Sequence, residues 1–334
     1  MKKQVFALWL FSPLFLFGQT PMPFNQTPTI EAAKQIVSSL DAVQKPLMLL
    51  SFADKDRLEW SNLPLEQVWR RGLRMDSLTE TQRQLVHNLL RTVLSQQGYQ
   101  KILLIMHYDD GIRERQIKAQ NPLSRRYGQE KYWLTIFGNP SATEAWGWQF
   151  EGHHVSLNLT LTPRGVTCTP MFTGINPALT TEGVSAGQYV MADENELGKQ
   201  LFNSLSPPLR KQALLGELPK DVDVLTRTGK ESHILKNEGV AYNDLTAEQK
   251  VVVLKIIKSW VGNLHEDLAA EKMQRLIKSL PQLRFAWLGD DDTAHLHYYR
   301  LQTPSFIIEM SNRDGGIYHL HTLWRDFEED FKEK

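Results

Sequence analysis

Residues 145–161 read AWGWQFEGHHVSLNLTL, and this stretch predicts a long β-strand. Its second part, residues 155–161, alternates apolar and polar side chains, which is the period of a strand with one buried and one polar face. The aromatic residues before it have the opposite parity: Trp146, Trp148 and Phe150. We therefore expect a β-bulge near Glu151-Gly152, which would place His154 on the polar face and His153 on the other.

The rest of the chain is expected to consist of blocks of helices followed by blocks of strands. Amphipathic periodicity predicts helices at Thr29–Leu40, Thr79–Gln97, Glu194–Leu205, Thr246–Leu264 and Glu266–Leu280. Further strands are predicted at Tyr132–Phe137, Leu283–Leu288, Ala294–Leu301, Phe306–Asn312 and Gly316–Trp324. Because strands gather at the end of each half, the α+β class with antiparallel sheets in one compact unit is favoured over βαβ winding.

Two segments of similar sequence indicate an internal duplication. LTETQR begins at Leu78 and LTAEQK at Leu245, so they lie 167 residues apart (245 − 78), and the same spacing separates His154 from His321. In each segment the threonine is a suitable N-cap for an amphipathic helix. The alternative is that two unrelated helix-and-sheet segments share only the chemistry of a helix start.

The duplication would divide the chain into two helix-plus-sheet halves, residues 29–162 and residues 195–330. Residues 163–194 between them are rich in glycine, proline, threonine and serine, which predicts a long loop. A loop of this length inside a compact protein is typical of a lid or of a segment that surrounds a site.

The N-terminus has the pattern of a secretory signal peptide. Two lysines precede an apolar run at residues 5–17, which is short for a membrane span and is interrupted by Pro13. We predict cleavage after Gly18-Gln19 or within it, so that residues 1–19 are the signal peptide and residues 20–28 an extended leader. The mature chain is then expected in a periplasm or outside the cell, with no membrane attachment.

Composition excludes several classes of site. The 334 residues contain one cysteine, Cys168, which excludes intramolecular disulfides and cysteine-cage zinc sites and, lying far from the N-terminus, a lipoprotein anchor. Lys and Arg together number 38, as do Asp and Glu, so no global positive field favours nucleic acid as a partner.

Six of the ten histidines fall into two groups near the ends of the halves: His153, His154, His295, His297, His319 and His321. Residues 312–316, with Gly315 in the left-handed position, predict a hairpin that places Glu309 opposite His319. The preceding turn would place Tyr299 opposite Glu309. One polar face of this meander would then carry His295, His297, Tyr299, Glu309, Ser311, His319 and His321. A slip of one residue would move part of this set to the other face.

Such a face suits a metal ion. Neutral imidazoles with one carboxylate bind borderline cations such as zinc or copper, and His-x-His on a strand directs both rings to one side. Glu309 could serve as ligand, as general base or as the group that orients His319. The alternative is a polar core in which histidines, tyrosines and backbone groups satisfy one another without a metal.

Other motifs are weaker. His154-Val155-Ser156 has the His-x-Ser pattern of two-histidine phosphoesterases, but Leu323 stands two residues after His321, so the second copy fails. Trp146 and Trp148 could stack on a sugar, although core packing is the favoured interpretation. No glycine-rich phosphate loop follows a predicted strand, and no G-x-S-x-G motif occurs.

Four blocks of sequence resemble the bacterial family called domain of unknown function 3500. They are residues 146–158 (WGWQFEGHHVSLN), 297–300 (HYYR), 306–309 (FIIE) and 319–326 (HLHTLWRD). The resemblance covers essentially the whole mature chain and implies an exported protein of this length, but it implies no reaction. It singles out for testing His153, His154, Asn158, His297, Arg300, Glu309, His319, His321 and Arg325.

Together these observations predict an exported, metal-dependent enzyme with zinc or copper between the polar faces of two related halves. The predicted ligands are His154, His319 and His321, and the predicted catalytic residues are Glu309, His297 and Arg300. The predicted substrate-binding residues are His153, Asn158, Tyr299 and Arg325. Hydrolysis by a metal-activated water is the default reaction, and an oxidative copper centre would use the same ligands. The alternative is a non-catalytic binding protein of the export compartment; the sequence does not identify the substrate or ligand.

Overall fold

The computed structural model describes residues 23–179, 187–218, 223–227, 236–290, 292, 295–313 and 319–332. The predicted signal peptide, residues 1–19, lies outside these ranges, as does most of the predicted turn after Asn312. Within the described ranges, no helix is long and apolar enough to cross a membrane.

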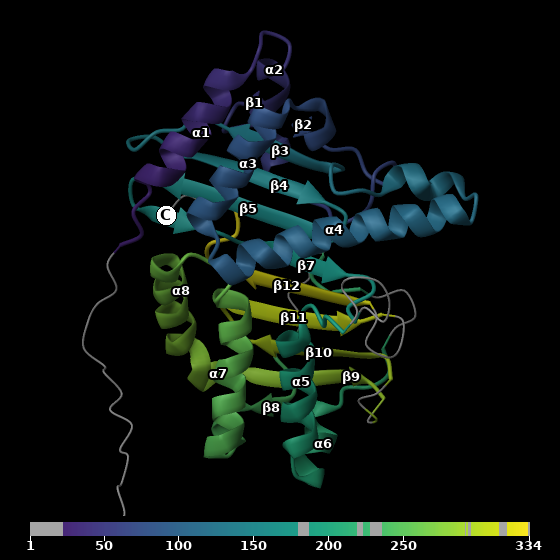
Figure 1. Ribbon diagram of the computed structural model, residues 1–334. Helices are drawn as coiled ribbons and strands as arrows, with labels where there is room; N and C mark the ends of the chain where they lie inside the picture. The colour runs from purple at the N-terminus through teal and green to yellow at the C-terminus, as the bar shows by residue number, and fades with distance from the viewer. Residues whose placement is uncertain are drawn as a thin grey trace, which may run out of the picture.

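The protein consists of helices packed on a single large sheet, which confirms the predicted α+β class (Figure 1). The 12-stranded sheet has the order β1-β3-β4-β5-β7-β12-β11-β10-β9-β8, with β2 paired to β3 and β6 to β5. In the structure the first half extends through β7, and its strands are β1 Leu49–Leu50, β2 Leu73–Arg74, β3 Tyr132–Phe137, β4 Trp146–Gly152, β5 Val155–Thr162, β6 Gly165–Thr167 and β7 Met171–Ile175. In the second half they are β8 Val240–Ala241, β9 Arg284–Gly289, β10 His297–Gln302, β11 Phe306–Asn312 and β12 Leu320–Asp326. Every pair is antiparallel except β1 with β3.

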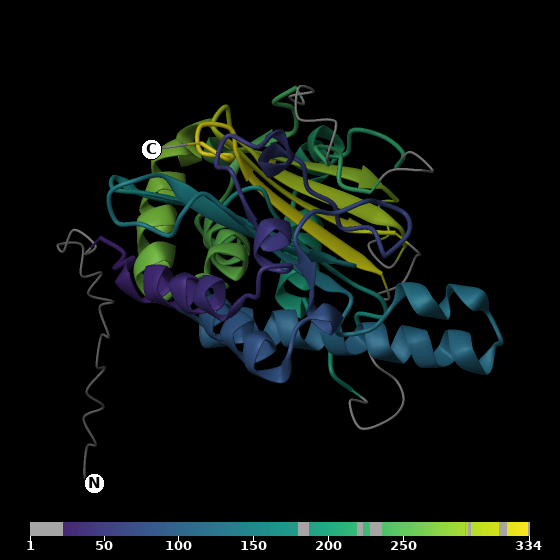
Figure 2. The ribbon, with the colours of Figure 1, turned by 90° about the horizontal axis from the view of Figure 1, so that it is seen from above.

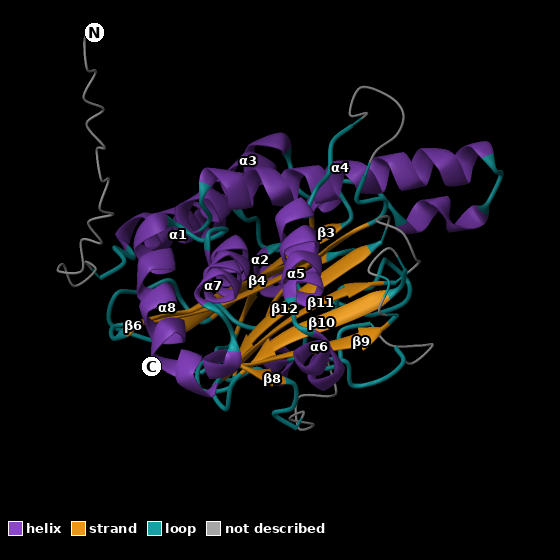
Figure 3. Cartoon of the chain, turned by 90° about the horizontal axis from the view of Figure 1, so that it is seen from below, coloured by secondary structure: helices purple, strands orange, loops and turns teal. Residues whose placement is uncertain are grey.

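The main helices gather on one face of the sheet, and loops cross the other (Figures 2 and 3). The helices are α1 Thr27–Ser39, α2 Lys45–Met48, α3 Glu80–Val93, α4 Gln96–Lys118, α5 Ala192–Ser204, α6 Pro207–Ala213, α7 Ala247–Val261 and α8 Glu266–Ser279. The large apolar core lies between them and the sheet. On the opposite side, here called the loop face, a small apolar cluster contains Trp60, Phe172, Val224 and Leu323.

The predicted single strand at 145–161 is a hairpin. A two-residue turn, His153-His154, joins β4 to β5, and His154 takes a left-handed φ of 66°. The turn reverses the chain and pairs Trp148 with Leu159, so the aromatic residues of β4 and the aliphatic residues of β5 share the core face. The bulge prediction was therefore wrong because a turn, not an extra residue, changes the parity.

Two other segments differ from the predictions. The predicted loop at 163–194 contains β6 and β7, and β7 is a central strand of the sheet. Helix α4 was not predicted, since only its first part, up to Asp109, contains buried residues. Its remainder extends past the sheet (Figure 1) and has no apolar stripe to reveal it.

The strand order reads similarly from either side of the central β7–β12 pair, and each half contains the same capping box. Thr79 with Gln82 begins α3, and Thr246 with Gln249 begins α7. This arrangement is what a duplication predicts, and the duplication itself stays a prediction. His154 and His321 are not equivalent within it, because His154 lies in a turn and His321 in a strand.

The helix layers of the two halves meet where α3 passes into α4. The Ser95 amide donates to the Asn263 carbonyl (3.0 Å), and the His265 amide donates to Val93 (2.8 Å). A Cβ on Gly98 would overlap the Asn263 carbonyl oxygen. Gly98 therefore permits a close approach between the helix layers of the two halves.

We predict that Gly98→Ala destabilises the protein by about 1–3 kcal/mol, because the added methyl forces this junction apart. The matched control is Gly111→Ala in the same helix, where a Cβ meets only the Arg115 side chain at 3.6 Å. That change should stabilise by up to about 1 kcal/mol through helix propensity. Urea unfolding of both variants measures the difference, and equal stabilities would contradict the assigned role of Gly98.

Candidate metal centre

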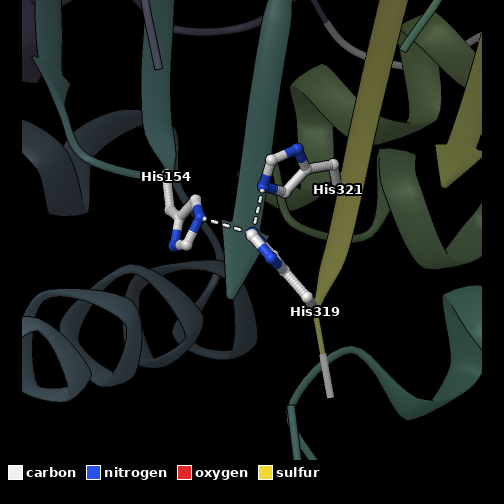
Figure 4. Close-up of side chains that lie close together, drawn as sticks. All are labelled: His154, His319 and His321. Carbon is white, nitrogen blue, oxygen red and sulfur yellow. Dashed lines mark hydrogen bonds between the residues drawn. The ribbon is translucent and has the colours of Figure 1, made fainter. Parts of the chain in front are cut away.

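Three histidines converge at one end of the central strands (Figure 4). His154 comes from the β4–β5 turn, His319 immediately precedes β12, and His321 lies within β12. Nε2 of His319 lies 3.2 Å from Nε2 of His154 and 2.9 Å from Nε2 of His321. His154 and His321 are buried, whereas His319 is partly exposed and gives the group contact with solvent.

The spacing of these nitrogens suits a shared metal ion. The candidate ligand nitrogens of the three histidines all lie within 4.8 Å of one another. Two imidazole nitrogens bound to one zinc at 2.0–2.1 Å with a tetrahedral angle are about 3.3 Å apart. The observed contacts therefore require only small movements to hold an ion.

Asp223 sets the proton arrangement of His321. Oδ1 of Asp223 lies 2.5 Å from Nδ1 of His321, so this nitrogen donates and the lone pair of a neutral ring is on Nε2. Although burial alone would raise the pKa of Asp223, the adjacent His321 lowers it to about 2. The carboxylate is therefore ionised at neutral pH and orients the ring, as second-layer carboxylates do at zinc sites.

His154 is kept neutral. Its burial lowers its pKa well below the ordinary value, and the neighbouring His153, His321 and His319 lower it further. If all three rings are neutral, only one of the two Nε2–Nε2 contacts is a hydrogen bond, because Nε2 of His321 then only accepts and Nε2 of His319 donates or accepts once. A cation at the centre would satisfy all three nitrogens.

A glycine makes room for the rings. Gly174 of β7 pairs directly with His321, and a Cβ there would lie 2.7 Å from Cδ2 of His321 and 3.1 Å from Cδ2 of His154. The Gly174 amide also donates to the His154 carbonyl (2.7 Å), while the His154 amide donates to Asn62 (3.0 Å). The left-handed turn is thus held from both sides.

A second group, Asp109 with His153 and His154, is a poorer candidate. Oδ1 of Asp109 lies 2.6 Å from Nδ1 of His153, so that nitrogen already has a partner. The His153 and His154 rings are stacked, with centroids 3.7 Å apart. Because the lone pairs of imidazole lie in the ring plane, the stacked rings keep them in two separate, nearly parallel planes, which is poorly suited to one shared ion. His153 therefore lies beside the three-histidine group without joining it.

The predicted catalytic residues Glu309 and Arg300 lie on the loop face, away from these contacts. The buried Glu309 carboxylate accepts hydrogen bonds from the Leu225 amide (2.7 Å), the Tyr298 hydroxyl (2.8 Å) and Thr226. Arg300 donates to the Lys236 carbonyl (2.9 Å). Whether these residues take part in catalysis stays a prediction.

The predicted register of the last two hairpins was wrong. Arg300, not Tyr299, pairs with Glu309, and Leu323, not His319, pairs with Glu309 on the other side. The register of β10 differs from the prediction by one residue, so the side chains of β10 exchange faces of the sheet. The register of β12 differs by four residues, an even number, so its side chains stay on the predicted face. His297 and Tyr299 consequently lie on the helix face.

On the helix face both residues are fully engaged. Nε2 of His297 lies 2.9 Å from Oδ1 of Asn195, and its ring stacks on Trp287. The Tyr299 hydroxyl donates to the Glu194 carbonyl. His295, exposed beside Asp290, lies outside the group as well.

The remaining predicted residues lie on the loop face. Asn158 donates to the Pro170 carbonyl (2.7 Å) and to Ser156, and Arg325 binds Asp330 (2.6 Å) and the Thr226 carbonyl. Asp223, Asn62 and Gly174 were missed by sequence reasoning. No motif marks them, because only the folded chain brings these segments to the histidines.

The burial of His297 predicts an acid-dependent stability. Burial lowers its pKa to about 4, whereas an unfolded histidine titrates near 6.5, so the unfolded chain binds more protons between these values. This stability is complete above pH 6.5 and is lost as the pH falls toward 4. We predict that wild type loses about 2 kcal/mol more than His297→Phe between pH 7 and pH 5 in urea unfolding. An equal loss in both proteins would contradict the neutral, buried state of His297.

Comparison with family models gives one match. The model described as "Protein of unknown function (DUF3500)" matches residues 24–333. Neither the curated proteins nor the solved structures contain a significant match to the chain. Since the match spans nearly all of its length, the chain belongs to the DUF3500 family, as the four sequence blocks indicated.

Proposed function

We propose that the protein is a metal-dependent enzyme whose ion is bound by His154, His319 and His321. The observation that supports this most is the convergence of three Nε2 atoms, one of them on a ring oriented by the buried carboxylate of Asp223. Neutral imidazoles of this kind favour zinc or copper.

The ligand number favours catalysis over a structural role. Structural zinc sites are closed by four protein ligands, whereas catalytic sites have three and keep a position for water or substrate. Among the described residues, no carboxylate or thiol joins the three histidines as a fourth ligand. Hydrolysis by a metal-activated water is then the default reaction, because the ion lowers the pKa of bound water to near neutrality.

Two alternatives use the same residues. An oxidative copper centre would have the same three ligands, and a non-catalytic protein of the export compartment would bind the ion or a ligand without turnover. We also propose that the chain is exported after cleavage near Gly18, because two lysines, an apolar run and a small residue precede the fold.

The first test is elemental mass spectrometry of the mature protein purified from the export compartment. We expect nearly one zinc or copper per chain, and loss of at least nine-tenths of it in His154→Ala and in His321→Ala. The matched control is His295→Ala, which removes an exposed histidine outside the group and should retain the metal. The intact mass of the same sample should correspond to cleavage after Gly18 or Gln19.

Absence of metal from wild type, even after reconstitution with zinc and with copper, would refute the metal centre. Equal loss in His295→Ala would show that the effect is not specific to the three histidines. Thermal unfolding of each variant separates loss of the ion from loss of the fold. An uncleaved intact mass would refute export without affecting the metal assignment.

A second test asks whether the coordination sphere is open. Cobalt(II) substituted for the native ion should give the visible absorption of a four- or five-coordinate site, and azide should change that spectrum by replacing a water. A spectrum unaffected by azide indicates a closed site and would contradict the enzyme in favour of a structural ion.

A further inference from the structure

A pocket on the loop face lies next to the histidine group. It has a volume of about 340 Å³ and lies between β3–β4 and the segment 56–71. Its wall includes Trp60, Trp69, Arg70, Arg71, Gln149 and Glu151. This volume is within the range of small-molecule sites, about 300–1,000 Å³.

A buried guanidinium holds one part of this wall in place. Arg70 is 9% exposed, and its Nη2 donates to the carbonyls of Ser61 (2.9 Å) and Leu63 (2.6 Å). Its Nε and Nη1 have no hydrogen-bond partner among the described residues, although Oε2 of Glu151 lies 3.8 Å from Nε. Both nitrogens are inaccessible from the pocket, and the guanidinium lies 5.2 Å from the centroid of the Trp133 ring, so Arg70 fixes the segment 61–63 and does not offer donors to a ligand.

The charges of the pocket do not select for an anion. Arg71 pairs with Asp56, and Arg70 lies beside Glu151, while Glu59 adds a further carboxylate to the wall. The arginines are therefore balanced by acidic groups. Guanidinium groups donate hydrogen bonds and carboxylates accept them, so a wall that contains both suits hydroxyl groups, each of which donates and accepts.

Tryptophan supplies the apolar part of the wall. Trp69 is 71% exposed, with the Arg71 guanidinium 4.8 Å from its ring centroid, and Trp60 is nearly buried. A tryptophan with this exposure at the edge of a pocket can stack on a ring of a ligand. An indole face matches the flat C–H face of a pyranose ring, whereas the polar groups match its hydroxyls.

Neighbouring residues of one segment contact both the pocket and the histidine group. The Ser61 amide donates to Oε1 of Glu151 (3.1 Å), and the next residue, Asn62, accepts from the His154 amide (3.0 Å). Glu151 is the second-to-last residue of β4, three residues before His154. A ligand in the pocket would therefore lie beside the turn that carries one of the proposed ligands.

We propose that this pocket binds a neutral sugar unit against Trp69, and that carbohydrate is the substrate class of the metal centre. The second statement rests on the proposed function, whereas binding itself does not. Trp146 and Trp148, the pair considered for stacking in the sequence, are buried in the core and take no part.

Calorimetric titration of the mature protein with maltotriose, cellotriose, xylotriose and tri-N-acetylchitotriose tests the proposal, with trigalacturonate as an anionic probe. At least one neutral trisaccharide should bind, and Trp69→Ala should weaken it at least tenfold. Trp69→Phe should weaken it less, because an aromatic face remains. The control Ile117→Ala removes another exposed apolar side chain, outside the pocket, and should bind as wild type.

Binding of no neutral trisaccharide, binding of trigalacturonate alone, or unchanged binding in Trp69→Ala would overturn the sugar pocket. The same titration on His321→Ala separates the two proposals. If the protein binds sugar but never holds metal, the metalloenzyme proposal is wrong and the sugar pocket stands. If the protein holds metal but binds no sugar, the sugar pocket is wrong and the metal centre stands.

Discussion

The pairing of β7 with β12 is the constraint on which the candidate centre depends. This ladder joins the sheet of the first half to that of the second, and it is reinforced by a buried bond between the hydroxyls of Thr173 and Thr322 (2.8 Å). It places Gly174 opposite His321 on the loop face. Because side chains alternate along a strand, a slip of one residue would turn His321 into the apolar core.

The loop face is unusually polar for a surface that is buried. Its apolar cluster is small, and charged side chains such as Glu309 and Arg325 are nearly inaccessible there. Each is held by partners from loops, Glu309 by the segment 223–227 and Arg325 by Asp330 and Thr226. Buried ion pairs and carboxylates add little stability compared with apolar residues of similar size. The polar composition of the loop face therefore contributes little to stability, and it fits the proposed function.

Local patterns carried much of the fold. The observed bounds of β3 and β11 equal the predicted ones, and the three histidines named as ligands lie together. Pairing between distant segments was not readable. The turn at His153-His154 has a left-handed residue, and that residue is a histidine. The glycine or asparagine that usually marks such a turn is therefore missing from the sequence at this position. The register of β10 depends on a turn whose length differs by one residue from the expected length, and Asp223 reaches His321 from a segment without a motif.

The two halves contribute unequally to the centre, although their strands are arranged similarly around it. The second half supplies His321 from a strand, and the first half has a glycine at the position opposite, where any side chain would meet the rings of His321 and His154. The first half instead supplies His154 from a turn. A symmetric pair of strand histidines would fill the space that the ion needs. Gly174 thus leaves room for the proposed coordination site, to which each half contributes histidines.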